Sequence, residues 1–175
     1  IYLKDKKYKL ALEFAIKRNS FSLKSNKNKK FDRQIILDTI DKYKSFYQSA
    51  HISINNEKNG LYHENLVFLV GFPRSGTTLL DSILRSHSKT LVLEEKPYLL
   101  DIRHNFFKKN KLENIMKISE NEIIQLQKKY FINFNYLDKK IIIDKFPLNI
   151  IEIGFIKRIF PKSKIILSLR HPLDS

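Results

Sequence analysis

Residues 66–87, with the sequence LVFLVGFPRSGTTLLDSILRSH, constrain the fold of this chain more than any other stretch. The segment opens with five apolar residues whose length and branched side chains are typical of a buried strand. Gly71 and Gly76 then frame a short loop, after which apolar residues recur at helical spacing. The predicted apolar face of this helix consists of Leu79, Leu80, Ile83 and Leu84. A strand, a glycine-bearing loop and a helix in this order direct backbone N–H groups at a phosphate, so a phosphate-binding loop is predicted.

The spacing of this loop departs from the nucleoside-triphosphate pattern G-x-x-x-x-G-K-[ST] at one position. Thr77 stands where that pattern has its lysine, whereas Thr78 keeps the hydroxyl, and the cation of the loop is Arg74. Without the lysine the loop is poorly suited to a polyphosphate, although its amides can still hold one phosphate monoester. The alternative interpretation is a tight strand-to-helix turn that binds nothing.

Apolar runs and helical patterns alternate through the rest of the sequence. Further strands are predicted at residues 90–93, 141–144 and 164–169, and helices at residues 97–106, 120–131 and 147–159. In the last of these helices the expected apolar side comprises Leu148, Ile151, Phe155, Ile156 and Ile159. Gly154 lies inside it, at a cost of roughly 1 kcal/mol relative to alanine, which indicates close packing there. The alternation predicts an α/β domain of the P-loop type, a three-layer sandwich with a mainly parallel sheet.

Two amphipathic helices are predicted ahead of this domain. The first has its apolar residues at Tyr8, Ala11, Leu12 and Ala15 and gives way to a polar run at residues 20–30. The second begins after a predicted N-cap at Asp32 and has Ile36, Ile40, Tyr43 and Tyr47 on one face. Because a polar linker follows, we expect a helical region at 1–60 and an α/β region at 61–175.

The composition argues against several classes of protein. Lysine and arginine total 33 against 18 acidic residues, a formal charge of +15, but the lysines are scattered rather than gathered with aromatic residues. We therefore expect no nucleic-acid partner, although the positive field would attract a polyanionic nucleotide. The chain has no cysteine for disulfides or thiolate metal sites, and no two histidines have metal-ligand spacing. No apolar run is long enough to span a membrane and no signal peptide is visible, which favours a cytoplasmic location.

Charged residues follow each of the four predicted strands. They are Arg74, Glu94 and Glu95, Asp144 and Lys145, and Arg170. Ligands of an open parallel sheet bind beyond the carboxyl ends of its strands. These side chains are therefore expected to converge on one edge of the sheet.

The loop and two later segments resemble the sulfotransferases that use 3′-phosphoadenosine 5′-phosphosulfate (PAPS). Residues 73–79, PRSGTTL, are similar to the 5′-phosphosulfate loop of that family. Residues 145–149, KFPLN, and residues 160–174, FPKSKIILSLRHPLD, resemble its 3′-phosphate segment, a strand ending in Arg-x-Pro-x-Asp. The resemblance extends over residues 66–175 and is strongest to the tyrosylprotein-sulfotransferase-like group and to bacterial sulfotransferases with tetratricopeptide repeats.

This resemblance implies transfer of a sulfuryl group from PAPS to an acceptor hydroxyl, with no metal required. The amides expected to hold the 5′-phosphate are those of Ser75, Gly76, Thr77 and Thr78. Arg170 is expected to bind the 3′-phosphate, while Arg74 and Lys145 stabilise negative charge on the transferring group and the leaving oxygen. The acceptor stays open among a protein tyrosine, a saccharide and a small alcohol.

A catalytic base must take the proton of the acceptor hydroxyl. In the tyrosylprotein group the base lies 21 residues after the loop arginine, and the resemblance therefore implies Glu95 rather than Glu94. A desolvated glutamate would suit this role. The alternatives are a helix-capping role for Glu95 ahead of Pro97, and His104 as the base.

Two other functions are compatible with the same residues. Residues 141–144 resemble a Walker B strand and Thr78 occupies the position of a magnesium-binding hydroxyl, so an ATP-dependent phosphoryl-transfer enzyme is the main alternative. The other alternative is a non-catalytic helical interaction module with a degenerate nucleotide fold. The helical region resembles the end of a tetratricopeptide array and its bridging helix, which implies a capacity to bind protein.

Both ends of the sequence suggest part of a longer protein. The chain starts within a helical pattern at Ile1 and stops shortly after Arg170. The family grips the 3′-phosphate with a serine beyond that arginine and closes the nucleotide site with C-terminal helices. We therefore expect the C-terminal part of the domain to be missing, with weak nucleotide binding and low stability of residues 1–175 alone.

Overall fold

The computed structural model describes residues 6–25, 33–49, 65–108, 111–133 and 141–171. The chain divides into two compact units, Ile1–Thr39 and Ile40–Ser175. In the first unit, helix α1 (Tyr8–Ser25) exposes most of its large apolar side chains. This predicted helix is confirmed but runs further than expected, through Ser20 to Ser25, and within it the Ser20 hydroxyl donates to the Lys17 carbonyl oxygen (2.7 Å). The expected N-cap at residue 32 and domain boundary at residue 60 lie outside the described residues.

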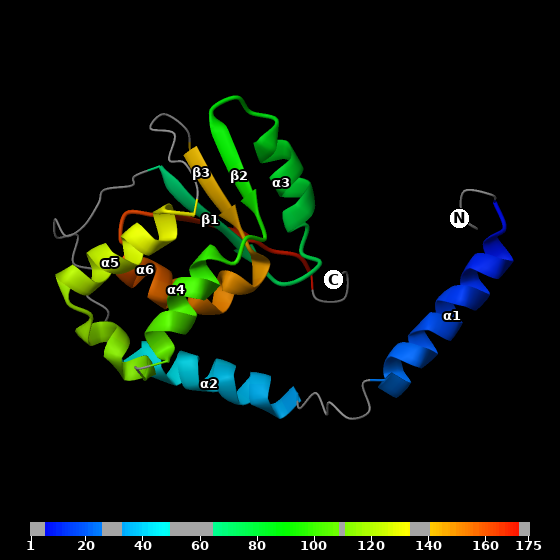
Figure 1. The fold of residues 1–175 in the computed structure, drawn as a ribbon, viewed down its shortest axis with the longest axis horizontal. Coiled ribbons are helices and arrows are strands. Elements are labelled where there is room, and N and C mark those ends of the chain that lie inside the picture. Colours follow the sequence, from blue (N-terminus) through cyan, green and yellow to red (C-terminus); the bar gives the residue numbers. More distant parts are fainter. Residues whose placement is uncertain (1–5, 26–32, 50–64, 109–110, 134–140, 172–175) are drawn as a thin grey trace. The chain divides into compact units, whose positions relative to one another are not determined.

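In the described part of the second unit, four parallel strands form a sheet in the order β2-β3-β1-β4 (Figure 1). Their bounds are β1, Leu66–Gly71; β2, Thr90–Glu94; β3, Ile141–Lys145; and β4, Lys164–Ser168. Each lies within one residue of its predicted position. The parallel arrangement is confirmed, and β1 is buried along its whole length because it is a central strand covered on both faces.

Helices cover both faces of the sheet, which confirms the alternating α/β pattern (Figure 1). Helix α3 (Thr77–Arg85) packs on one face, where Leu80 and Leu84 lie against an apolar cluster of Val67, Leu69, Val92 and Ile143. The opposite face is covered by α4 (Tyr98–Phe107), η2 (Leu112–Lys117), α5 (Glu120–Phe131) and α6 (Ile153–Ile159). The side chains of β1 alternate between the two clusters, as expected for a strand buried on both faces.

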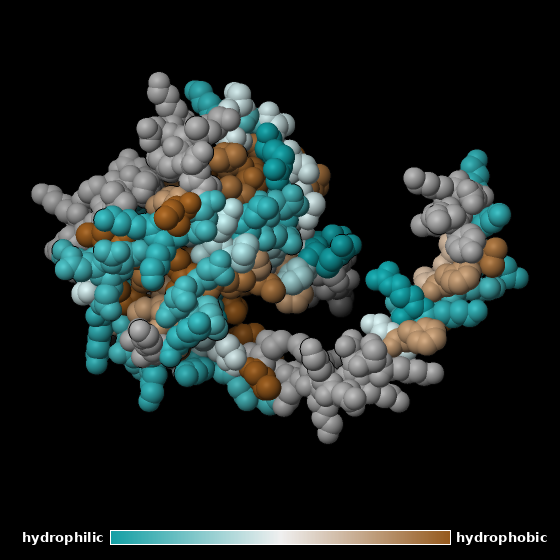
Figure 2. Space-filling view, in the orientation of Figure 1, coloured by the Kyte–Doolittle hydropathy of each residue, from teal (hydrophilic) through white to brown (hydrophobic). Residues whose placement is uncertain are grey.

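Helices α4 and α5 lie close to where the sequence predicts them. Pro97 precedes α4, and Leu99, Ile102 and Phe106 are its buried residues. Ser119 caps α5, since its backbone N–H donates to Glu122 Oε2 (2.9 Å) while its hydroxyl accepts from the Glu122 N–H (3.4 Å). Figure 2 shows hydrophilic side chains over much of the visible face around α5, with smaller hydrophobic areas between them.

The predicted apolar face of α3 is wrong in half of its members. Leu79 and Ile83 are 69% and 59% exposed, whereas Asp81, expected on the polar side, is buried. The helix is rotated so that Asp81 faces the ends of the strands, where a buried lysine, Lys145, lies near it. The need to pair that buried charge explains why an acidic side chain replaces a leucine on the inner face.

The single helix predicted at residues 147–159 is two elements. A 3₁₀ segment, η3 (Pro147–Glu152), precedes α6, and two residues of the predicted apolar face, Leu148 and Ile151, are exposed in it. Residues three apart share a face in a 3₁₀ helix, which turns Asn149 and Glu152 inward in their place. In α6 the predicted core residues Phe155, Ile156 and Ile159 are fully buried, as expected.

The second half of helix α2 (Arg33–Ser49) packs against the α4–α6 side of the sheet. Tyr43, Phe46 and Tyr47 contact the core there, whereas Ile40 is exposed. The Tyr47 ring lies where a Cβ on Gly154 would be, which confirms the close packing predicted at that glycine. The side chain of residue 36, predicted on the same face, lies outside the described residues.

Candidate active site

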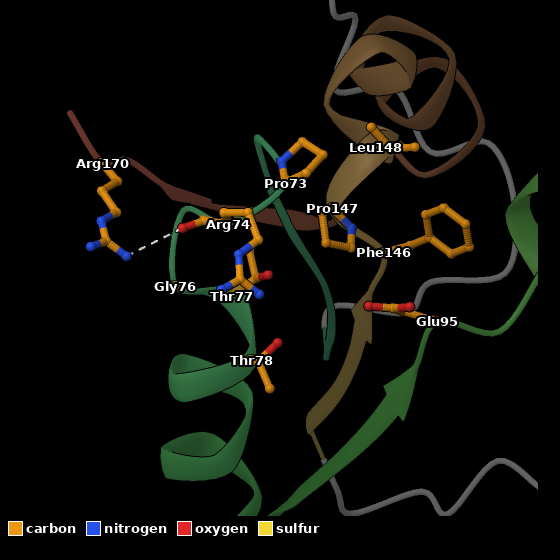
Figure 3. A pocket seen from close by; sticks show the side chains of 10 residues that line it. All are labelled: Pro73, Arg74, Gly76, Thr77, Thr78, Glu95, Phe146, Pro147, Leu148 and Arg170. Carbon is orange, nitrogen blue, oxygen red and sulfur yellow. Dashed lines mark hydrogen bonds between the residues drawn. The ribbon is translucent and has the colours of Figure 1, made fainter. Parts of the chain in front are cut away.

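A pocket of about 530 Å³ opens at the carboxyl ends of the strands (Figure 3). Its lining residues are Pro73, Arg74, Gly76, Thr77, Thr78, Glu95, Phe146, Pro147, Leu148 and Arg170. They follow β1, β2, β3 and β4, so each strand contributes to the rim, as expected for an open parallel sheet. The structure thus brings Arg74, Glu95 and Arg170 together around one pocket, as expected, whereas Asp144 and Lys145, expected at the same edge, do not line it. The volume is in the range of a small-molecule site.

The loop from β1 to α3 adopts a conformation suited to an anion. Arg74 and Gly76 both have left-handed backbone angles, with φ of 71° and 94°. Alternating backbone conformations of this kind turn successive N–H groups toward one point. Arg74 lacks the freedom of glycine, and a non-glycine residue in the left-handed region is uncommon and often functional.

The backbone N–H groups of Gly76, Thr77 and Thr78 make no backbone hydrogen bond to any described residue. They lie at the start of α3, where helical partners are lacking and the helix dipole favours an anion. The Ser75 amide differs from the expectation, because it already donates to the Phe72 carbonyl oxygen (3.0 Å) and closes the turn. Its hydroxyl is buried and has no partner in the described part of the chain.

Strand β4 supports the loop from behind. The Ser168 hydroxyl donates to the Ser75 carbonyl oxygen (2.8 Å). A Cβ on Gly71 would lie 2.6 Å from Ser75 Oγ and 2.8 Å from the Ser168 carbonyl oxygen, so only glycine fits there. The loop is therefore held in shape by its own chain before any ligand binds.

Figure 3 shows two arginines at the loop, Arg74 within it and Arg170 beside it. Arg74 and Arg170 are both exposed, and Arg170 Nη1 lies 3.5 Å from the Arg74 carbonyl oxygen. Arg170 thus approaches the loop from β4, although almost a hundred residues separate the two in sequence. Two guanidinium groups beside helix amides have the chemistry to bind a ligand with more than one anionic group.

Glu95 is the carboxylate of this pocket. It follows β2 with a left-handed φ of 47°, and its N–H donates to the Lys145 carbonyl oxygen (2.8 Å). Figure 3 shows its side chain extending toward the loop. Glu94, one residue earlier, is not among the lining residues and pairs with Arg85 instead (3.3 Å). The Glu95 side chain is 57% exposed, so the desolvation expected of it is not found.

Lys145 is placed differently from its expected role. Its side chain is 1% exposed and does not contribute to the pocket lining. The ammonium group donates to Glu95 Oε1 (2.8 Å) and lies 3.6 Å from Glu94 Oε1 and 4.0 Å from Asp81 Oδ2. Lys145 thus contacts the pocket through Glu95, whereas the sequence implied direct contact with the reacting groups.

Asp144 points away from the loop, toward α5. It is fully buried and accepts a hydrogen bond from the Tyr130 hydroxyl (2.6 Å). Burial raises the pKa of this carboxyl to about 7, although the Tyr130 hydrogen bond lowers it. This geometry does not fit the metal-binding aspartate of a Walker B strand. No group of three or more His, Cys, Asp and Glu residues in the described ranges could hold a metal ion.

His104, the alternative candidate for the catalytic base, lies outside the pocket. It is exposed on α4 and does not line the pocket. Asp81 and Arg85 were not predicted as site residues, although their spacing of four on a helix is a recognisable ion-pair signal. None of the described helices is both long and apolar enough to cross a membrane.

Two comparisons with known proteins bear on the family of this chain. A family model described as "Sulfotransferase family" matches residues 66–175. An uncharacterized protein of Aquifex aeolicus (strain VF5) is 33% identical over 119 residues, which cover 62% of this chain and 16% of that relative. The matched family region contains the loop, both arginines, Glu95 and Lys145. The chain belongs to the sulfotransferase family.

Proposed function

We propose that this domain transfers a sulfuryl group from PAPS to an acceptor hydroxyl. One observation carries the proposal: a single pocket combines a phosphate loop that lacks the nucleotide-triphosphate lysine, a second arginine from β4, and a carboxylate. A nucleotide with phosphates at both ends needs two anion sites. A hydroxyl acceptor needs a base beside the group that is transferred.

The loop side of the pocket fits the nucleotide. The free N–H groups of Gly76, Thr77 and Thr78 would hold the 5′-phosphate. Arg170 would bind the 3′-phosphate, which distinguishes PAPS from ordinary adenylates. Arg74, inside the loop, would stabilise charge on the sulfuryl oxygens and the leaving phosphate oxygen.

The chemistry is an in-line displacement at sulfur. The acceptor oxygen forms a bond to sulfur while the bond from sulfur to the bridging phosphate oxygen breaks, and 3′,5′-diphosphoadenosine leaves. The acceptor proton goes to the Glu95 carboxylate. Glu95 is suited to this because it lines the pocket and extends toward the loop, whereas Glu94 pairs with Arg85.

The other side of the pocket would receive the acceptor. Phe146, Pro147 and Leu148 form an apolar wall there, on the side of the pocket where Figure 3 places Glu95. An apolar wall favours a hydroxyl attached to an apolar or aromatic group, such as a phenol or a tyrosine side chain, over a saccharide with many hydroxyls.

A phosphoryl-transfer enzyme is the weaker candidate. It would need the loop lysine, which is Thr77 here, and an aspartate facing the phosphates, whereas Asp144 faces Tyr130. A non-catalytic module would bind the nucleotide but show no transfer.

Calorimetric titration of the full-length protein distinguishes these functions. We expect 3′,5′-diphosphoadenosine to bind more tightly than ATP with Mg²⁺ and more tightly than 5′-AMP, which lacks the 3′-phosphate. Arg170→Ala should remove the preference over 5′-AMP. Tighter binding of ATP with Mg²⁺, or equal binding of the two adenylates by the parent, would contradict the proposal.

A further inference from the structure

Five charged side chains form a cluster between α3 and the ends of β2 and β3. They are Asp81, Arg85, Glu94, Glu95 and Lys145, here called the pocket cluster. Glu95 is the one member that lines the pocket. The other four lie beyond the pocket lining, so their effect on a bound ligand must pass through Glu95.

Arg85 binds two of the three carboxylates. Its Nη2 donates to Asp81 Oδ1 (2.9 Å) and Oδ2 (3.1 Å), and its Nε donates to Asp81 Oδ1 (3.1 Å). The same Nη2 lies 3.3 Å from Glu94 Oε2. An exposed ion pair at this helical spacing contributes little to stability. Asp81 is buried, however, so removing its partner Arg85 would leave a buried charge uncompensated.

The nearest partner of the Lys145 ammonium group is the Glu95 carboxylate. A buried ammonium group must be paired, and three carboxylates lie within 4.0 Å of it. Because Arg85 binds Asp81 and Glu94, the shortest contact of Lys145 is the 2.8 Å hydrogen bond to Glu95 Oε1. With two cations and three carboxylates the cluster has a net charge of −1, and Glu95 is its only carboxylate that lines the pocket.

We propose that Asp81 and Arg85 are positioning residues for the base. They set which carboxylate Lys145 binds, and Lys145 in turn fixes the Glu95 side chain at the edge of the pocket, on a backbone already constrained by its left-handed φ of 47°. The inference rests on the proposed function, in which Glu95 accepts the acceptor proton. Its new content is that the selectivity between Glu94 and Glu95 is set by the helix that follows the phosphate loop.

Loss of Arg85 has a specific consequence on this account. Asp81 and Glu94 become free to compete for the Lys145 ammonium group, so the hydrogen bond to Glu95 weakens and the carboxylate loses its orientation. A misplaced catalytic group can lower turnover up to about a hundredfold. Nucleotide affinity should be unchanged, because neither Arg85 nor Asp81 lines the pocket.

The test compares crystal structures and kinetics of the full-length parent, Arg85→Ala, Arg85→Lys and the double variant Arg85→Ala/Asp81→Asn. In Arg85→Ala we expect Lys145 Nζ to move toward Asp81 and the 2.8 Å contact with Glu95 to be lost. The contact should persist in Arg85→Lys and return in part in the double variant, since Asp81 is then uncharged and Glu94 alone competes with Glu95 for Lys145. Ile83→Ala, on the exposed side of the same helix, is the matched control and should keep the parent geometry.

Kinetics with PAPS and 4-methylphenol supply the second readout. Arg85→Ala should lower kcat more than fivefold with the affinity for 3′,5′-diphosphoadenosine unchanged, and the double variant should recover part of the loss. An Arg85→Ala structure that keeps the Lys145–Glu95 contact would overturn the inference, as would an equal loss of nucleotide affinity and turnover. If Glu95→Gln keeps full turnover, the proposed base is wrong instead, which separates the two failures.

Discussion

The pocket cluster can be compared with a second charged cluster on the other side of the sheet. This clamp cluster comprises Tyr43 of α2, Arg103 of α4 and Glu152 at the end of η3. Arg103 Nε lies 2.6 Å from Glu152 Oε1, and Arg103 Nη2 donates to the Tyr43 hydroxyl (3.0 Å). Each cluster thus joins an arginine to a buried carboxylate.

The two clusters differ in whether a charged member lines a pocket. Every member of the clamp cluster binds another member, and the cluster joins α2 to α4 and η3. Burial raises the pKa of Glu152, although Arg103 opposes that shift. In the pocket cluster one carboxylate, Glu95, also lines a pocket and has a strained backbone. A buried ion pair therefore indicates function only where a member reaches a site that can hold a ligand.

The largest effect is expected at Arg74, the cation inside the loop. Removing one preorganised donor to a developing charge costs about 2.7–4 kcal/mol of transition-state stabilisation. Arg74→Ala should therefore lower kcat for PAPS by about a hundredfold or more while the unfolding midpoint stays that of the parent. Turnover within a few fold of the parent would contradict this role.

The Asp144 carboxyl should make stability depend on pH. Its folded pKa of about 7 lies above the unfolded value near 3.9, so between about pH 4 and pH 7 the folded state keeps a proton that the unfolded state releases. Stability contributed by this group is therefore full below about pH 4 and falls as the pH rises to about 7. Asp144→Asn should remove the dependence and stabilise the domain at pH 8 by up to about 4 kcal/mol.

Urea unfolding of the parent and Asp144→Asn from pH 4 to pH 8 measures this difference. Other groups titrate in both proteins and cancel in the comparison. Parallel pH curves for the two proteins would show that Asp144 does not carry the effect.

Substitutions in the clamp cluster should change the stability of the protein and leave its turnover unchanged. Arg103→Met leaves Glu152 buried without its cation, which is expected to cost about 3 kcal/mol of unfolding free energy. The double variant Arg103→Met/Glu152→Met should recover most of that loss, since both charges are then absent. Denaturant unfolding measures the loss, and unchanged turnover below the midpoint is the control. A loss of turnover larger than the loss of folded protein would make this cluster part of the site.

The smallest effect on stability is expected at the contact between Tyr47 of α2 and Gly154 of α6. The Tyr47 hydroxyl is buried without a partner in the described chain, so Tyr47→Phe should raise the unfolding free energy by up to about 1 kcal/mol. Gly154→Ala should act in the opposite direction, because its methyl group would overlap the Tyr47 ring. Thermal unfolding of both variants tests the contact, and a destabilised Tyr47→Phe would show that the hydroxyl is bonded.

The strands and most helices could be predicted because local pattern decides them. Runs such as residues 66–70 and 141–143 are apolar throughout and end at glycine or charge, and each became a buried parallel strand. The rotation of α3 could not be predicted in this way, because Asp81 turns inward to meet charges distant in sequence. A helical pattern counts apolar residues and gives no weight to a buried ion pair.

The pocket was predicted better than the contacts behind it. Arg74, Glu95 and Arg170 could be placed because each follows a strand of a parallel sheet. The burial of Lys145 could not, since a lysine after a strand is ordinarily exposed, and its pairing depends on Arg85 drawing other carboxylates away. Such competition among charges is a property of three-dimensional distances and leaves no local signal in sequence.

Glu95→Gln and Glu152→Gln, made side by side in the full-length protein, test the central claim most directly. Turnover with PAPS and 4-methylphenol, affinity for 3′,5′-diphosphoadenosine and urea unfolding are measured for each. We predict that Glu95→Gln loses turnover by about a hundredfold or more while keeping nucleotide affinity, and that it loses less stability than Glu152→Gln, because Glu94 and Asp81 still lie within 4.0 Å of the Lys145 ammonium group. Glu152→Gln should lose stability while keeping turnover. Near-normal turnover in Glu95→Gln, or a larger loss in Glu94→Gln, would contradict the assignment of Glu95 as the base.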